Sequence, residues 1–208
     1  NQEIKEYKHP NIGYANEGTE FLSDQKVNQD ATGIFAVEQF KFAKYWSFLG
    51  SVRYDVINNE LTDNLKQPYD VSGSKDFNKA TAKLGLAFSP KPEINIYANW
   101  GQGFQPPCTE ELVNNPNGFG GFNQDLTYST FMSEELGFRG TIKKGMLDYD
   151  IAAFYMNTEN DIDRYRTPDR PLETFYRNIG KTARFGVELF TKVIPVRQVI
   201  FQAAYTFS

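Results

Sequence analysis

The chain has 208 residues, a length that suits one or two domains. Its formal net charge of −4 and pI near 5.2 argue against a nucleic-acid-binding protein, which would carry a basic face. Aromatic residues make up 15% of a chain whose mean hydropathy is −0.54, a combination that suits β-strands with one apolar and one polar face.

Alternating hydrophobic runs predict antiparallel strands, because successive side chains of a strand point to opposite faces. The run from Tyr45, for example, puts Trp46 and Phe48 on one face and Ser47 and Ser51 on the other. About eight such strands are predicted, over residues 31–42, 45–58, 77–89, 92–104, 131–142, 145–159, 174–193 and 197–208. The first of them is the weakest, since Glu38 shares the parity of Phe40 and suggests a β-bulge.

The connections between these strands are short and long in turn. Ala43 and Lys44 alone join the first two strands, residues 58–76 form a long polar connection, and the tight turn at 89–91 precedes a long loop at 105–130. Outer-membrane barrels have short periplasmic turns and long external loops. A soluble sandwich or barrel would show the same alternation with its apolar face as the core, so parity alone leaves both folds open.

Two observations favour the membrane fold. All the long loops lie on one side, and large apolar-face aromatics gather near strand ends, as interfacial girdles do. If the short turns are periplasmic, the predicted eight strands start and finish outside, which indicates a middle piece of a larger barrel. The aromatics expected near the turns are Trp46, Phe88 and Tyr149, and those expected near the loops are Tyr54, Trp100, Tyr155 and Tyr205.

Three segments resemble motifs of the TonB-dependent outer-membrane receptors. The segment 97–112 resembles the run Tyr-Ala-x-x-x-x-Gly-Phe-x-x-Pro-x-x-x-Glu-Leu of that family. Residues 133–155 resemble its Glu-x-Gly-x-Arg-Gly strand and the following Ala-x-Phe-Tyr strand, and residues 178–189 resemble its Asn-x-Gly-x-x-x-x-x-Gly-Val-Glu strand. Each motif alone is weakly specific, but the three occur in the order of the family.

The resemblance implies an all-β, antiparallel, up-and-down transmembrane barrel in the outer membrane of a Gram-negative bacterium. Members have about 22 strands closed around an N-terminal plug that contacts the energy-coupling protein TonB. Residues 1–208 are therefore expected to be part of the barrel domain, in contact with outer-membrane lipid, with the plug domain absent.

The same resemblance implies active uptake of a scarce, large solute, with a ferric siderophore as the leading candidate. Haem, cobalamin and glycan uptake are the alternatives within the family, although the loop 105–130 contains no histidine, which disfavours haem. A passive structural or adhesive barrel is the alternative outside it.

Nothing in the sequence predicts an enzyme, a cofactor, a catalytic residue or a metal site. There is no Ser/His/Asp set, phosphate loop or metal-ligand spacing. One cysteine, Cys108, and one histidine, His9, exclude an internal disulfide and any site that needs paired imidazoles. Cys108 is predicted to be a free loop thiol without an assigned role.

Two groups of residues are candidates for contacts with a ligand or with the plug. The loop group could stack on a flat ligand or pair with an anionic one, or could simply pack the loops: Phe119, Phe122, Tyr128, Arg164, Tyr165 and Arg166. The second group has the parity expected to face the barrel lumen, where wall-to-plug or cross-strand pairs are favoured: Arg53, Asp55, Tyr97, Asn99, Glu135, Arg139, Arg184 and Glu188.

Overall fold

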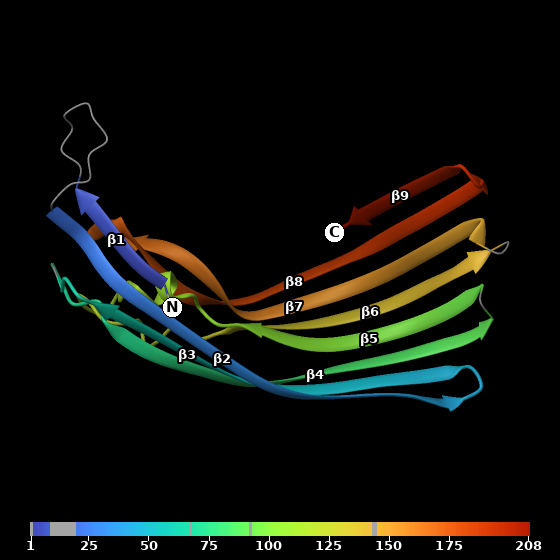
Figure 1. Ribbon diagram of the computed structural model, residues 1–208, viewed down its shortest axis with the longest axis horizontal. Coiled ribbons are helices and arrows are strands. Elements are labelled where there is room, and N and C mark those ends of the chain that lie inside the picture. Colours follow the sequence, from blue (N-terminus) through green and yellow to red (C-terminus); the bar gives the residue numbers. More distant parts are fainter. Residues whose placement is uncertain (1, 9–19, 67, 92, 143–144) are drawn as a thin grey trace.

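The computed structural model describes residues 2–8, 20–66, 68–91, 93–142 and 145–208. The strands of this part of the chain form one curved antiparallel sheet in which each strand pairs with its neighbour in sequence (Figure 1). The elements are β1 (Gln2–Lys8), β2 (Glu20–Ala43), β3 (Trp46–Asp63), β4 (Gly73–Lys91), β5 (Ile94–Gln105), α1 (Thr109–Val113), β6 (Ser129–Ile142), β7 (Leu147–Thr167), β8 (Arg170–Val196) and β9 (Val199–Phe207).

The sheet has nine strands rather than the predicted eight, because part of the expected N-terminal loop is a hairpin. β1 pairs with the first third of β2, from Gln2 opposite Val27 to Lys8 opposite Glu20. This part of β2 has polar residues on both faces and therefore gives no hydrophobic alternation. His9 lies outside the described residues.

The strands also continue past the apolar runs that predicted them. β3 ends at Asp63 and β4 begins at Gly73, so the connection expected over 58–76 is shortened to residues 64–72, and the two strands form a longer hairpin than predicted. β7 and β8 likewise pair as far as Thr167 and Arg170. Backbone hydrogen bonds between strands need no apolar side chains. A prediction from hydrophobic alternation therefore ends these strands too early.

The bulge expected at Glu38 is absent. β2 and β3 stay in register from Gln25 opposite Asp63 to Lys41 opposite Ser47, and the irregularity falls between Lys41 and Ala43 at the turn. Glu38 therefore keeps the parity of Phe40 and places a carboxylate on the apolar face.

The apolar face of the sheet is exposed along its length. Val52, Tyr54 and Leu136 are exposed by 60%, 44% and 60%, which a soluble sandwich would bury in its core. Near the turns this face carries packed aromatics, with the Trp46 and Phe88 rings 4.8 Å apart and those of Phe138 and Tyr149 5.2 Å apart. Such an exposed apolar face with aromatics at its edge is what a lipid-facing barrel wall requires.

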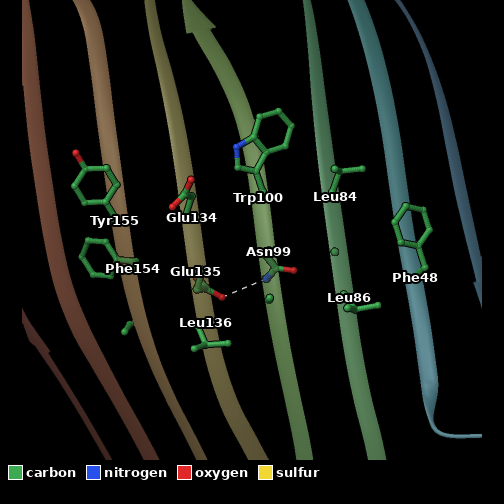
Figure 2. Close-up of a pocket in the computed structure, with 13 residues that line it drawn as sticks. Phe48, Leu84, Leu86, Asn99, Trp100, Glu134, Glu135, Leu136, Phe154 and Tyr155 are labelled. Atoms are coloured by element: carbon green, nitrogen blue, oxygen red, sulfur yellow. Dashed lines mark hydrogen bonds between the residues drawn. The ribbon is translucent and has the colours of Figure 1, made fainter.

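Figure 2 shows a shallow hollow on this apolar face, between β3 and β7. Leucines of β4 and β6 line it, and Trp100 and Tyr155 stand on either side of Glu134. Glu134 and Glu38 are thus two carboxylates with lipid-facing parity.

Among the described residues, no helix is long and apolar enough to cross a membrane.

The buried core lies at the loop end of the opposite face. Leu112 of α1, together with Phe122 and Leu126 of the following loop, packs on Leu61 of β3 and Phe77 of β4. Each of these side chains is at most 4% exposed. Burial of this kind contributes about 1.5–3 kcal/mol per side chain, so the loop 106–128 is held down on the sheet. We call the surface that it covers the loop-bearing face.

Asparagine side chains join this loop to β8. The Asn178 side-chain amide donates to the backbone carbonyls of Thr127 and Asn160 at 2.9 and 2.8 Å, and its Oδ1 accepts from the Thr127 N–H at 2.8 Å. Asn114 donates to the Thr174 carbonyl at 2.8 Å. Within α1, the Glu111 carboxylate accepts from the Cys108 N–H at 2.8 Å, which caps the helix start.

We expect Asn178→Ala to loosen the loop 106–128. The change leaves one N–H and two carbonyl groups without their partner, at a cost of about 1–3 kcal/mol. Hydrogen exchange of the peptide around Thr127 should accelerate accordingly. Asn78→Ala is the matched control, because the Asn78 side chain is exposed and makes no hydrogen bond with the described residues. Equal exchange in the two variants would refute the role of Asn178.

Candidate ligand-binding face

The sheet register puts all eight predicted lumenal residues on the loop-bearing face. Residues opposite one another across an antiparallel pair share a face. Asp55 lies opposite Lys79, Asn99 opposite Glu135, and the register continues through β7 to β8. The eight side chains lie on the same face of the sheet as Leu61 and Phe77, which the loop covers.

Four of the eight come together in the middle of this face. The Tyr97 hydroxyl donates to Asp150 at 3.2 Å, and the Arg139 guanidinium lies 4.9 Å from the Tyr97 ring centroid. The Asn99 amide donates to Glu135 at 3.3 Å, drawn as a dashed line in Figure 2. The sequence analysis did not select Asp150. The available signal was its position two residues after Asp148, since the two aspartates then share the polar face of β7.

The cluster depends on Gly137. This buried glycine lies directly opposite Tyr97, and a methyl group at its Cα would overlap the Tyr97 ring. The absence of a side chain lets the ring lie flat across β6. From there the hydroxyl group of Tyr97 reaches Asp150 on β7.

The other four predicted residues lie apart from this cluster. Arg53 and Asp55 bind each other, with the Arg53 Nε 2.8 Å from both carboxylate oxygens. Arg184 and Glu188 are exposed on β8, and neither forms an ion pair with another described residue.

The three loop aromatics have different surroundings. Phe122 is 3% exposed and belongs to the core beneath the loop, where it has no surface for a ligand. Tyr128 is half-buried, with Phe77 and Phe104 packed against its ring edge-on and the Lys79 ammonium 5.0 Å from its centroid. Packing therefore accounts for these two aromatics.

Phe119, in contrast, is 62% exposed at the loop surface. Its ring stacks on Tyr69 with centroids 4.6 Å apart, and the guanidinium of Arg170 lies 4.8 Å from its centroid. Arg170 also donates to the carbonyls of Asn115 and Gly118 at 3.1 Å, and it pairs with Glu173. This ion pair lowers the pKa of the Glu173 carboxyl group.

Arg170 thus connects the loop 106–128 to the start of β8, and sequence reasoning did not select it. The available signal was the Arg-x-x-Glu spacing of residues 170 and 173 beside the turn. In the neighbouring β7, Tyr165 packs on Phe175 with ring centroids 5.8 Å apart. Arg164 and Arg166 are exposed, and neither pairs with Asp161, Asp163 or Asp169 in the described structure.

The connection between β3 and β4 is ordered by two aspartates. Asp63, 4% exposed, accepts from the backbone N–H groups of Leu65 and Lys66 at 3.1 and 3.2 Å. Asp70 accepts from the Ser72 N–H at 2.9 Å and pairs with Lys66 at 3.1 Å. Hydrogen bonds from Ser72 are the largest cause that lowers the pKa of Asp70 to about 2. The carbonyl of Asp70 in turn accepts from the Gly121 N–H at 3.0 Å, which joins this loop to the next one.

Comparison with known proteins gives one family and a set of solved structures. The family model described as TonB dependent receptor-like, beta-barrel matches residues 2–208. Among curated proteins, the chain is 24% identical over 168 residues to the metal-pseudopaline receptor CntO of Pseudomonas aeruginosa strain UCBPP-PA14. That match covers 77% of this chain and 21% of the relative, so the chain spans about a fifth of the relative's length.

Two solved structures show the same fold. The copper transporter OprC aligns with a TM-score of 0.73 at 14% identity, over 98% of this chain and 31% of that one. The siderophore receptor PiuA of Acinetobacter baumannii aligns with a TM-score of 0.69 at 17% identity, over 93% of this chain and 28% of that one. At these identities the likeness concerns the fold alone.

We expect Gly137→Ala to destabilise the folded protein by about 1–3 kcal/mol, because the added methyl group overpacks the site of Tyr97. The midpoint of urea unfolding, followed by tryptophan fluorescence, should fall. Gly180→Ala is the matched control, since nothing lies within 4 Å of a methyl group added there. A midpoint that falls equally in both variants would show that the close approach of Tyr97 is not the cause.

The order of the Asp70 turn should depend on pH. The pKa of Asp70 is lowered to about 2 in the folded chain, so its contribution is full above the ordinary aspartate pKa near 4. It is lost as the pH falls from about 4 to about 2. The protection of the Ser72 amide, corrected for intrinsic exchange, should fall over this range in the native protein and stay flat in Asp70→Asn. A flat profile in both would refute this linkage.

Proposed function

This chain belongs to the family of TonB-dependent receptor β-barrels, and from that premise we propose that the protein containing it imports a ferric siderophore across the outer membrane. The family consists of transport receptors located in the outer membrane of Gram-negative bacteria. The nine adjacent strands of the described residues would form part of such a barrel wall.

The main observation behind the proposal is that the sheet has two chemically different faces. One is apolar and exposed, and an ordered loop covers part of the other. The exposed apolar face suits lipid, and the loop-bearing face carries charged groups, such as Arg184 and Glu188, that form no ion pair with the described residues. A receptor that binds a large solute and later releases it inward needs this arrangement. It needs no bond chemistry, in keeping with a transport receptor.

First contact with the solute is proposed for the exposed members of the loop group. Phe119 is 62% exposed at the loop surface, and Arg164 and Arg166 of β7 are exposed cations that form no ion pair with the described residues. Tyr165 stiffens that segment by packing on Phe175. Phe122 and Tyr128 support the loop from below.

The plug and TonB are proposed partners of the whole receptor. Exposed apolar side chains on the loop-bearing face, such as Phe35 at 68% and Val37 at 55%, are the kind of surface that an enclosed plug would cover. The charged residues Arg184 and Glu188 would pair with it. TonB would act through that plug, and outer-membrane lipid would cover the opposite face.

Relatives with other cargo keep a second ligand class open. The metal-pseudopaline receptor CntO and the copper transporter OprC both resemble this chain, so uptake of another metal complex is the second candidate. Haem is less favoured, because the loop 105–130 contains no histidine that could act as an axial ligand.

Growth of a strain that lacks the full-length gene tests the proposal. On iron supplied as single ferric siderophores, we expect loss of growth on one of them and full growth on haem and on the others. The full-length gene on a plasmid should restore growth. Unchanged growth of the deletion strain on every siderophore, haem and cobalamin source would overturn the uptake function.

A further inference from the structure

A hollow of about 610 Å³ lies on the loop-bearing face between β1, β2, β3 and α1. Its volume is in the range of small-molecule sites. The strands supply the side chains of one wall and the loop supplies the other, since the residues around it are Ile4, Gln25, Val27, Gln29, Leu61, Cys108, Thr109, Glu110 and Val113.

The polar groups of the hollow are almost all uncharged. Gln25 and Gln29 provide amides that both donate and accept, and Thr109 provides a hydroxyl group. Partial desolvation raises the pKa of the exposed Cys108 thiol above its ordinary value, which favours the neutral form. Glu110 is the one charged residue among the nine that line the hollow.

A buried amide next to the hollow adds an independent observation. Asn59 is 1% exposed and lies opposite Gln29, whose amide donates to the Asn59 Oδ1 at 2.8 Å. The Asn59 amide nitrogen has no hydrogen-bond partner among the described residues. Buried amides normally form hydrogen bonds. The Gln29–Asn59 pair therefore makes this side of the hollow polar, and the Asn59 amide nitrogen is a donor that none of the described residues uses.

Three cations of β3 and β4 on this face are engaged elsewhere, and the exposed Lys83 lies opposite Ser51, on the turn side of Arg53. Arg53 binds Asp55, and the Lys75 ammonium donates to the Gln124 carbonyl. Lys79 lies over the Tyr128 ring at 5.0 Å. The exposed Arg164 and Arg166 of β7 are not among the residues that line the hollow.

We propose that this hollow is a ligand subsite for an uncharged or cationic solute rich in hydroxyl and amide groups, and that it disfavours polyanionic complexes. The inference rests on the proposed uptake function and narrows its ligand class. Amide and hydroxyl groups recognise neutral hydrogen-bonding groups, and Glu110 attracts a positive charge while repelling a carboxylate or catecholate.

The test measures binding to the purified full-length receptor by quenching of tryptophan fluorescence. Three ferric complexes serve as probes: a cationic linear trihydroxamate, an uncharged cyclic trihydroxamate and a trianionic tris-catecholate. We expect both trihydroxamates to bind at least tenfold more tightly than the tris-catecholate. Glu110→Gln should weaken the cationic complex about tenfold and spare the uncharged one.

Gln25→Lys is a second test of the effect of charge in the hollow. The Gln25 side chain makes no hydrogen bond with the described residues, so the change removes none of them. It should weaken the cationic complex and strengthen the trianionic one. Glu60→Gln is the matched control, because Glu60 is exposed on the other face of β3 and should leave all three affinities unchanged.

The outcomes separate this inference from the uptake function. Tight binding of the tris-catecholate, unaffected by Glu110→Gln and Gln25→Lys, would overturn the subsite and leave siderophore uptake standing. Effects of equal size in Glu110→Gln and Glu60→Gln would also overturn it. Failure of the receptor to bind any of the three iron complexes would count against both.

Discussion

Strand register is the constraint on which the rest of this structure depends. A slip of one residue between two strands would move every side chain of one strand to the opposite face. In β3, that slip would turn Trp46, Phe48 and Val52 toward the loop-bearing face and Leu61 away from its core. The long, uninterrupted pairing of β2 with β3 and of β7 with β8 makes such a slip costly, because many backbone hydrogen bonds share one register.

The loop 106–128 adds a second constraint, because it joins strands that are not neighbours in the sheet. Its apolar residues bury against Leu61 and Phe77, and Asn178 fixes its backbone to β8. Sequence resemblance had selected the segment beginning at Asn178 as a family motif, and the structure gives that asparagine a physical task. The loop thereby closes over part of the sheet without a disulfide or a long helix.

Sequence could predict the sheet and its faces, because period-2 alternation is strong wherever one side of a strand is apolar. It could not predict β1 or the polar ends of β3 and β8, where backbone hydrogen bonds hold residues without hydrophobic alternation. The prediction at Glu38 was wrong. An acidic residue on the apolar face suggested a β-bulge, but β2 and β3 stay in register there.

The candidate site was predictable to a similar extent. Parity placed Tyr97, Asn99, Glu135 and Arg139 on one face, and the register of β5 with β6 makes them neighbours, because strand pairing follows from order in the chain. Arg170 and the hollow beside α1 could not be found this way, since they depend on how a loop folds back over distant strands. The roles of Phe119 and Phe122 differ for the same reason: only tertiary packing decides which of two nearby aromatics is buried.

The extended hairpins and the pinned loop have a thermodynamic consequence for recognition. Ordering a flexible residue costs about 1–2 kcal/mol of backbone entropy, and a loop that folds only around its ligand loses that amount from its affinity. Here the hydrogen bonds of Asn178 and the core around Phe122 order the loop when the chain folds. The loop-bearing face is therefore preorganised, so a ligand that bound there would lose little affinity to ordering of this loop.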